Sequence, residues 1–148
     1  VRNIKKLKDE SNVSPIIVTS RRTSKAHEEF LYEQTLTFSS PASIWFHKDG
    51  INADLSALFN QVDSIFVTEE SSTMINEAIS SGLPVCTLYP KVIKSPKSFS
   101  DQISKLRNMN FISSIPFKSE LTHNTLNNNL KIIEIRESLK KNIINRIK

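Results

Sequence analysis

The sequence contains a single cysteine, Cys86, so no disulfide can form within the chain. Cys86 lies in a short apolar run, and we expect it to be a small buried core residue. No apolar run approaches the about 18 residues that a membrane-spanning helix needs, and no stretch has the pattern of a signal peptide. A reducing, cytoplasmic setting is therefore the default expectation.

Aromatic residues make up only 7% of the chain, and few of them lie among the basic residues. The net charge of +5 suits an anionic ligand, an anionic lipid surface or nucleic acid. Nucleic-acid binding has little support, because no recognised motif is present and aromatic side chains for base stacking are scarce. With 148 residues, 38% of them hydrophobic and 24% charged, the chain has the size and composition of one ordinary globular domain.

The most informative stretch runs from residue 63 to residue 88 and reads as strand, turn, helix, turn and strand. Residues 64–68 and 85–88 are short apolar runs typical of buried strands. Hydroxyl side chains that favour helix N-termini follow the first run, and Gly82 and Pro84 end the helix. Apolar residues between these limits predict one buried helix face, formed by Met74, Ala78 and Ile75. The stretch therefore predicts a βαβ unit.

Ligands of parallel sheets bind at the carboxyl ends of the strands, which here is the segment 68–73. A helix N-terminus offers unpaired N–H groups and a partial positive charge, so a phosphate fits there, and serine and threonine hydroxyls add donors. Glu77 lies about one turn further along the helix and could reach a ribose. The alternative is that Ser71, Ser72 and Thr73 only cap the helix, and the stretch by itself leaves both interpretations open.

Two motifs resemble one known family. The run VTEESSTMINEA (67–78) followed by SGLPV (81–85) is similar to the pattern V-T-x-D-S-x-x-M-x-x-E-A and then G-x-P-V. Upstream, TSRRT (19–23) matches a second element of the same family at a suitable distance. The chain thereby resembles, over residues 15–117, the mitochondrial-fission ELM-like family, whose members in bacteria and plants are similar to the nucleotide-binding half of GT-B glycosyltransferases.

The resemblance implies an α/β fold, with a Rossmann-like parallel sheet flanked by helices, as in the C-terminal domain of a GT-B glycosyltransferase. In the family, a strand with a glycine-rich turn and a whole N-terminal domain come before the segment matching residue 1. We therefore expect the sequence to be a C-terminal half that lacks its first strand. The expected organisation is a nucleotide-sugar-binding domain (1–118), a polar linker (119–129) and an amphipathic helix (130–148).

A basic segment follows the strand expected at residues 15–19. Arginine guanidinium groups match phosphate oxygens two at a time, so the segment can hold a diphosphate, although a solvated loop is the alternative. Ser24 is expected to cap a helix from Lys25 to about residue 37. Its apolar residues are Ala26, Phe30 and Leu31, and three glutamates are expected to keep the other side in water, namely Glu28, Glu29 and Glu33. The diphosphate-contacting set in this segment is Ser20, Arg21, Arg22 and Thr23.

A short strand (43–46) is followed by the loop 47–52, which should lie at the same carboxyl edge. His47 could donate to a phosphate or sugar oxygen, although a lone loop histidine is more often neither base nor ligand. The family has glycine, one residue, and then asparagine, proline and tyrosine at this place. Asn52 matches the asparagine, whereas Ala53 and Asp54 replace the proline and tyrosine. If the family tyrosine contacts the base or the donor, this chain lacks that contact.

Three acidic residues of the central stretch have implied roles. Glu69 and Glu77 have the Glu-x7-Glu spacing that some GT-B enzymes use for donor sugar and ribose, and Glu77 is the ribose-binding candidate. The family acid corresponds to Glu70, a candidate for sugar contact, and a small residue usually stands at position 69. Glu69 would repel a diphosphate unless its carboxylate points away. Glu69 and Glu70 have no third metal ligand nearby in the sequence, so we expect no bound metal.

The resemblance implies a metal-independent transfer of a sugar from a nucleotide-diphosphate donor, with a cell-envelope molecule as the expected acceptor. The nucleotide sugar is a substrate, and no cofactor is expected. No catalytic residue is assigned, because the base would come from the N-terminal domain, and the chain alone is expected to be inactive. The other reading is a non-catalytic GT-B-like scaffold or membrane-recruitment module.

Residues 130–148 predict a final helix with a stripe of apolar residues, Ile132, Ile135, Leu139, Ile143 and Ile147. The remaining positions carry six basic and two acidic residues, a net charge of +4. Such a stripe packs on its own protein, in GT-B folds commonly the N-terminal domain, or lies on an anionic membrane surface. Expected partners are therefore the nucleotide-sugar donor and the N-terminal domain, with peripheral contact with the inner membrane as an alternative and no nucleic acid.

Overall fold

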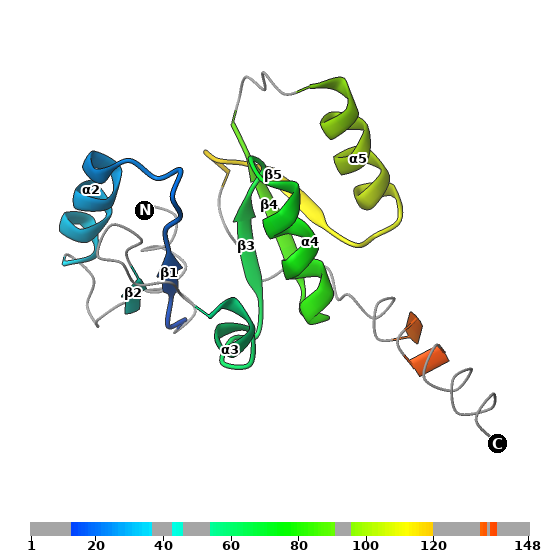
Figure 1. The fold of residues 1–148 in the computed structure, drawn as a ribbon, viewed down its shortest axis with the longest axis horizontal. Coiled ribbons are helices and arrows are strands. Elements are labelled where there is room, and N and C mark those ends of the chain that lie inside the picture. Colours follow the sequence, from blue (N-terminus) through cyan, green and yellow to red (C-terminus); the bar gives the residue numbers. More distant parts are fainter. Residues whose placement is uncertain are drawn as a thin grey trace. The chain divides into compact units, whose positions relative to one another are not determined.

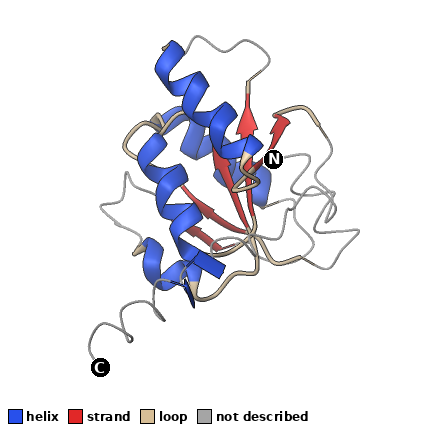
Figure 2. Ribbon diagram, turned by 90° about the vertical axis from the view of Figure 1, so that its right-hand side faces the viewer, coloured by secondary structure: helices blue, strands red, loops and turns tan. Residues whose placement is uncertain are grey.

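The computed structural model of the chain describes residues 13–36, 43–45, 54–90, 96–119, 134–135 and 137–138, and for 43–45 only the backbone is described. Its residues form two compact units, unit 1 from Val1 to Leu58 and unit 2 from Phe59 to Lys148, and each is described by itself. Figure 1 labels the elements, and Figure 2 shows that helices and strands dominate the described parts.

Unit 1 contains two parallel strands, β1 (Ile16–Val18) and β2 (Ser43–Trp45), in which Ile17 pairs with Ile44. Helix α2 (Lys25–Thr35) lies between them in the sequence. The short helix α3 (Leu55–Phe59) begins after Asp54, whose Oδ1 accepts the N–H groups of Ser56 and Ala57. Sequence patterns thus predicted β1, α2 and β2, with ends that differ by one or two residues.

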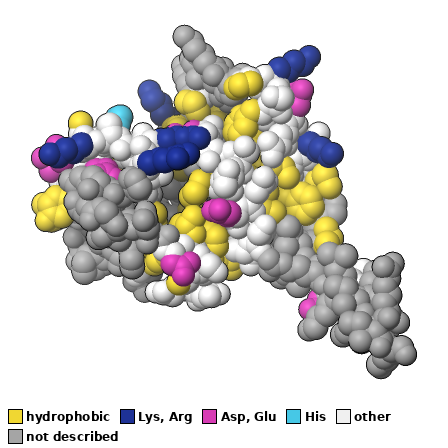
Figure 3. All heavy atoms as spheres, in the orientation of Figure 1, with side chains coloured by type: hydrophobic (Ala, Val, Ile, Leu, Met, Phe, Trp, Pro, Cys, Tyr) yellow, Lys and Arg dark blue, Asp and Glu magenta, His cyan; other side chains and the backbone are white. Residues whose placement is uncertain are grey.

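The buried face of α2 differs from the prediction. Glu28 is only 1% exposed and Thr35 is buried, whereas Ala26 is exposed and Phe30 is 53% exposed. The prediction that Glu28 faces water was wrong, because Thr19 at the end of β1 supplies a hydroxyl that hydrogen-bonds its carboxylate. Figure 3 shows that both charged and apolar side chains are exposed on the face of the molecule that it draws.

Unit 2 contains a parallel sheet with the strand order β3-β4-β5. The strands are β3 (Ile65–Thr68), β4 (Val85–Tyr89) and β5 (Ser113–Pro116), connected by α4 (Ser72–Ser81) and α5 (Lys97–Asn108). Phe66 pairs with Cys86, which in turn pairs with Ser113. Three parallel strands with helical connections form a Rossmann-like α/β arrangement, as the sequence predicted.

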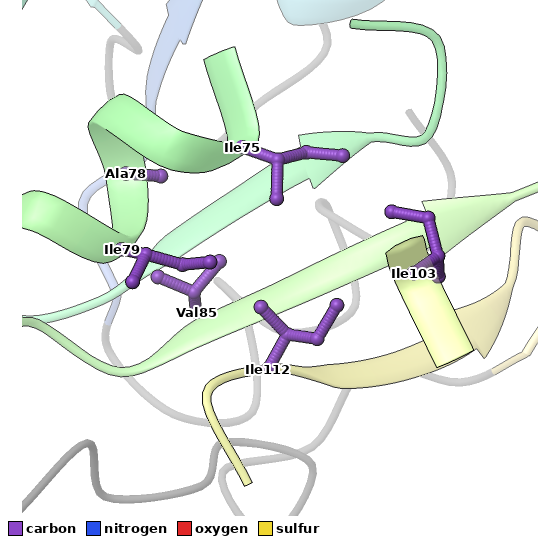
Figure 4. Packing of buried hydrophobic residues seen from close by; sticks show 6 residues of the cluster. All are labelled: Ile75, Ala78, Ile79, Val85, Ile103 and Ile112. Carbon is purple, nitrogen blue, oxygen red and sulfur yellow. The ribbon is translucent and has the colours of Figure 1, made fainter. Parts of the chain in front are cut away.

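The core of unit 2 lies on one face of this sheet. Its buried residues come from both helices, from β4 and from the residue before β5, and they point toward one another in Figure 4: Ile75, Ala78, Ile79, Val85, Ile103 and Ile112. Side chains alternate along a strand, so Val85 and Thr87 face the helices while Cys86 and Leu88 face the other side. Ile79 was missing from the predicted helix face, and Met74 is only partly buried.

Local signals set the limits of α4. Ser71 is the N-cap, and its Oγ accepts the N–H of Met74 at 3.5 Å. Gly82 is the C-cap with φ of 83°, a left-handed conformation that a residue with a Cβ adopts at a cost. The cap prediction at both ends is confirmed, and it fixes where the helix N-terminus lies relative to β3.

Candidate functional site

The N-terminus of α4 lies directly after the carboxyl end of β3. Thr68 ends the strand, the N–H of Glu69 donates to Leu88 O at 2.9 Å, and the N–H of Glu70 donates to Thr68 O at 2.8 Å. Ser71 then begins the helix. Two residues therefore turn the chain from the sheet edge into the helix, so the first turn of α4 lies at the edge where parallel sheets bind ligands.

Ser72 and Thr73 occupy the first helical turn, where N–H groups have no carbonyl partner within the helix. Ser72 is half-buried and Thr73 is exposed. Together with the hydroxyl of Ser71, these residues offer backbone and side-chain donors to an anion. The structure thus brings Ser71, Ser72 and Thr73 together at one helix end, as the sequence predicted.

Glu77 is exposed and lies four residues after Thr73, so the two side chains are neighbours on the outer surface of α4. Helical side chains point back toward the N-terminus, which directs Glu77 toward the first turn. Glu70 is also exposed. A carboxylate at this place can accept hydrogen bonds from hydroxyl groups of a bound sugar.

Glu69 points into the protein. Its side chain is 3% exposed, and its carboxylate accepts the hydroxyl of Thr87 at 2.5 Å and lies 3.8 Å from a guanidinium nitrogen of Arg107. The hydroxyl of Thr87 also lies 2.6 Å from Ser114 Oγ, and Arg107 Nε donates to Ser114 Oγ at 3.2 Å. The repulsion that a glutamate at position 69 would exert on a diphosphate is therefore reduced, because its charge is directed at a threonine and an arginine.

Sequence reasoning missed Thr87, Ser114 and Arg107. They lie on β4, β5 and α5, from 18 to 45 residues after Glu69 in the sequence. The one available signal was the polar Thr87 in an otherwise apolar strand, since a buried hydroxyl normally has a hydrogen-bond partner.

Cys86 lies on β4 next to this network and is fully buried. Desolvation by burial raises the pKa of its thiol, a hydrogen bond with Ser113 lowers the pKa, and the nearby Glu69 charge raises it. The net effect is a raised pKa, so the buried thiol stays neutral, in agreement with its predicted role as a small core residue.

This shift predicts a pH dependence. Because the folded pKa exceeds that of the unfolded chain, about 8.5, the stabilisation is complete below that pH and is lost as pH rises through the folded value. We expect urea unfolding to show an extra loss of about 1.4 kcal/mol per pH unit in this window for the wild type relative to Cys86→Ala. Parallel pH profiles of the two proteins would contradict the assignment.

In unit 1, Ser20 to Thr23 form a closed turn after β1. The N–H of Thr23 donates to Ser20 O at 2.8 Å, the N–H of Ser20 donates to Thr23 Oγ1 at 3.2 Å, and the N–H of Arg22 donates to Ser20 Oγ at 3.2 Å. Arg21 and Arg22 are exposed at its tip. Such a turn presents two guanidinium groups to solvent, as an anion-contacting segment requires.

Ser24 caps α2, as predicted: its Oγ accepts the N–H of His27 at 3.3 Å and lies 2.8 Å from His27 Nδ1. Just before the turn, Thr19 Oγ1 donates to Glu28 Oε1 at 2.5 Å, whereas Glu28 Oε2 is buried and has no hydrogen-bond partner among the described residues. In each unit, a threonine and a buried glutamate thus lie next to a segment that the sequence singled out for phosphate contact.

The remaining predicted residues have other positions. His47 and Asn52 lie outside the described residues, as does most of the predicted helix 130–148. Ser20–Thr23 belong to unit 1 and Ser71–Glu77 to unit 2. Among the described residues, no group of three His, Cys, Asp or Glu side chains could hold a metal ion. Within the same residues, no helix is both long and apolar enough to cross a membrane.

A family model described as Mitochondrial fission ELM1 matches residues 1–137, which is nearly the whole chain. The chain belongs to this family. The match extends the resemblance seen in the two motifs to residues 1–137 of this ELM1-family chain. Comparison with curated proteins found no match, and comparison with solved structures found none either.

Proposed function

We propose that this ELM1-family chain binds a nucleotide-diphosphate sugar and contributes the donor site of a glycosyltransferase. The observation that carries the proposal is the first turn of α4, where donors of Ser71, Ser72 and Thr73 lie at the carboxyl end of a parallel strand. Helix N-termini bind phosphate through unpaired N–H groups and the helix dipole, without a metal ion.

Each candidate residue has a stated role in this proposal. The first turn of α4 holds the diphosphate, and Glu77 accepts hydrogen bonds from the ribose hydroxyls. Glu70 contacts the sugar. Fixed donors that stabilise charge on a leaving diphosphate would lower the barrier for glycosyl transfer. On the resemblance, Arg21, Arg22 and the hydroxyls of Ser20 and Thr23 also contact phosphate, and His47 and Asn52 contact the sugar or base.

Thermal melting with UDP, GDP, CMP and their sugar conjugates tests this function. A ligand at about 100 times its dissociation constant stabilises the folded protein by about 2.7 kcal/mol, which raises Tm by several degrees. We expect one nucleotide to shift the wild type, and the shift to be lost in Glu77→Ala and Arg21→Ala. Matched controls are Glu33→Ala and Lys105→Ala, which remove an exposed charge from α2 and α5.

One result would exclude the proposal, and another would remove one part of it. If no nucleotide shifts Tm in a protein that also contains the expected N-terminal domain, donor binding is excluded. If Arg21→Ala behaves as its control while Glu77→Ala loses the shift, the role of the turn 20–23 fails and that of α4 stands.

A second candidate function is a scaffold that recruits a partner or a membrane. The observation in its favour is the predicted helix 130–148, with an isoleucine-rich stripe and a net charge of +4, in which Ile135 is helical and exposed. Sedimentation with anionic vesicles tests it: binding that disappears in Ile135→Glu, without any nucleotide effect, would favour the scaffold.

A further inference from the structure

Glu69 stands at the carboxyl end of β3, two residues before the α4 N-cap, yet its carboxylate is withdrawn from solvent. The side chain is 3% exposed, and the carboxylate accepts the Thr87 hydroxyl at 2.5 Å. A carboxylate with this burial and this partner is unavailable to a ligand at the helix end. Its neighbour Glu70, by contrast, is exposed.

The backbone of the same residue is tied to the sheet as well. Its N–H donates to Leu88 O at 2.9 Å, one residue beyond Thr87 on β4. The side chain and the backbone of Glu69 therefore hold the same strand at two adjacent residues. Because only Glu70 separates Glu69 from the N-cap Ser71, this double anchor fixes where α4 begins.

The partner of Glu69 is itself fixed. Thr87 is fully buried, and its hydroxyl lies 2.6 Å from Ser114 Oγ and 3.3 Å from Ser113 O on β5. Arg107 on α5 donates to Ser114 Oγ and lies 3.8 Å from the Glu69 carboxylate. Position 69 is thus connected to β4, β5 and α5, which makes the turn before α4 part of the rigid sheet.

We propose that Glu69 is a positioning residue, which holds the first turn of α4 in the geometry that binds phosphate and does not itself contact the donor. The inference rests on the proposed function, since it assigns how that binding site is kept in place. Donors that are fixed before the ligand arrives bind more tightly, because less freedom is lost on binding.

Affinity measurements by calorimetry, at a temperature where every variant is folded, test the proposal. The probes are a nucleoside diphosphate and its sugar conjugate, UDP with UDP-glucose or GDP with GDP-mannose. We expect Glu69→Ala and Thr87→Val to lower the affinity for both probes by the same factor, on the order of tenfold. Residues that hold a binding group in place have effects of this size. Glu69→Gln keeps an acceptor for Thr87, and we expect its affinity to stay within about threefold of the wild type.

Asp63→Ala is the matched control, because it removes an exposed carboxylate just before β3. If Glu69 contacts the sugar directly, Glu69→Ala would instead weaken binding of the sugar conjugate only. Tighter nucleotide binding in Glu69→Ala would show that the carboxylate repels the phosphates. Unchanged affinity in Thr87→Val would show that the hydrogen bond between Thr87 and Glu69 does not position the first turn of α4. Each of these three results overturns the proposal.

Amide hydrogen exchange of the ligand-free protein supplies a readout that does not depend on nucleotide binding. We expect Glu69→Ala to speed exchange at residues 69–74 by at least about tenfold, while the amides of β5 keep their wild-type rates. If no probe binds the wild type but exchange changes as expected, the proposed function fails and the anchoring role stands. If exchange at residues 69–74 is unchanged, the positioning role is wrong.

Discussion

Replacing Ile75 by alanine is expected to lower the free energy of unfolding by about 2–5 kcal/mol. Ile75 is completely buried in the core of unit 2, among side chains of α5, β4 and the residue before β5. Removing its outer carbons leaves a cavity that the surrounding residues fill only partly. For a chain of this length the loss corresponds to a fall in Tm of about 6–15 °C.

Urea unfolding followed by circular dichroism measures this effect. Ile135→Ala is the matched control, because it makes the same chemical change at a side chain that is 44% exposed. We expect it to cost less than about 1 kcal/mol, since less apolar surface returns to water. Equal losses in the two variants would contradict the burial of Ile75 in the core of unit 2. Because Ile75 belongs to the first turns of α4, its loss should also weaken nucleotide binding.

The second large effect is expected in unit 1, where Thr19→Val removes the hydroxyl that donates to the buried Glu28. Glu28 Oε2 already has no hydrogen-bond partner, so the substitution leaves a buried carboxylate with neither oxygen bonded through the described residues. A buried acceptor without a donor costs about 1–3 kcal/mol, and more when it is charged. We therefore expect a loss of about 3 kcal/mol.

Fluorescence of the single tryptophan, Trp45 on β2 in the same unit, can follow this unfolding. Thr73→Val makes the same chemical change at an exposed position and should be nearly neutral. The double variant Thr19→Val/Glu28→Leu should recover most of the loss, because replacing both partners by apolar groups removes the unsatisfied charge. A double variant less stable than Thr19→Val alone would show that Glu28 has a further stabilising role.

Both large effects concern residues that support candidate site segments without being proposed to contact the ligand. Ile75 packs α4 into the core of unit 2, and Thr19 directly precedes the turn 20–23. The family resemblance implies roles for hydroxyl, basic and acidic side chains that follow β1 and β3. The contacts in the structure add the buried glutamates, Glu28 and Glu69, each hydrogen-bonded by a threonine. A destabilised support can therefore mimic a lost contact, and binding should be measured where each variant remains folded.

Much of the local structure could be predicted from the sequence. Ser71, Gly82 and Pro84 set the ends of α4, because capping depends on side-chain chemistry and backbone freedom at single positions. The apolar runs 64–68 and 85–88 predicted two parallel strands, and both form. The last strand, β5 (Ser113–Pro116), begins with two serines, so no apolar run marks its limits, which pairing with β4 decided.

The sequence by itself determined the α/β class, the helix caps, the placement of Ser71, Ser72 and Thr73 at a strand end, and membership of the family. Only the tertiary structure decided where the two glutamates point. A charged side chain faces water unless a partner compensates for its burial, and the partners of Glu28 and Glu69 are a threonine nine residues before and one 18 residues after. No local pattern encodes such a pairing, because it arises only when the fold brings residues of different elements together.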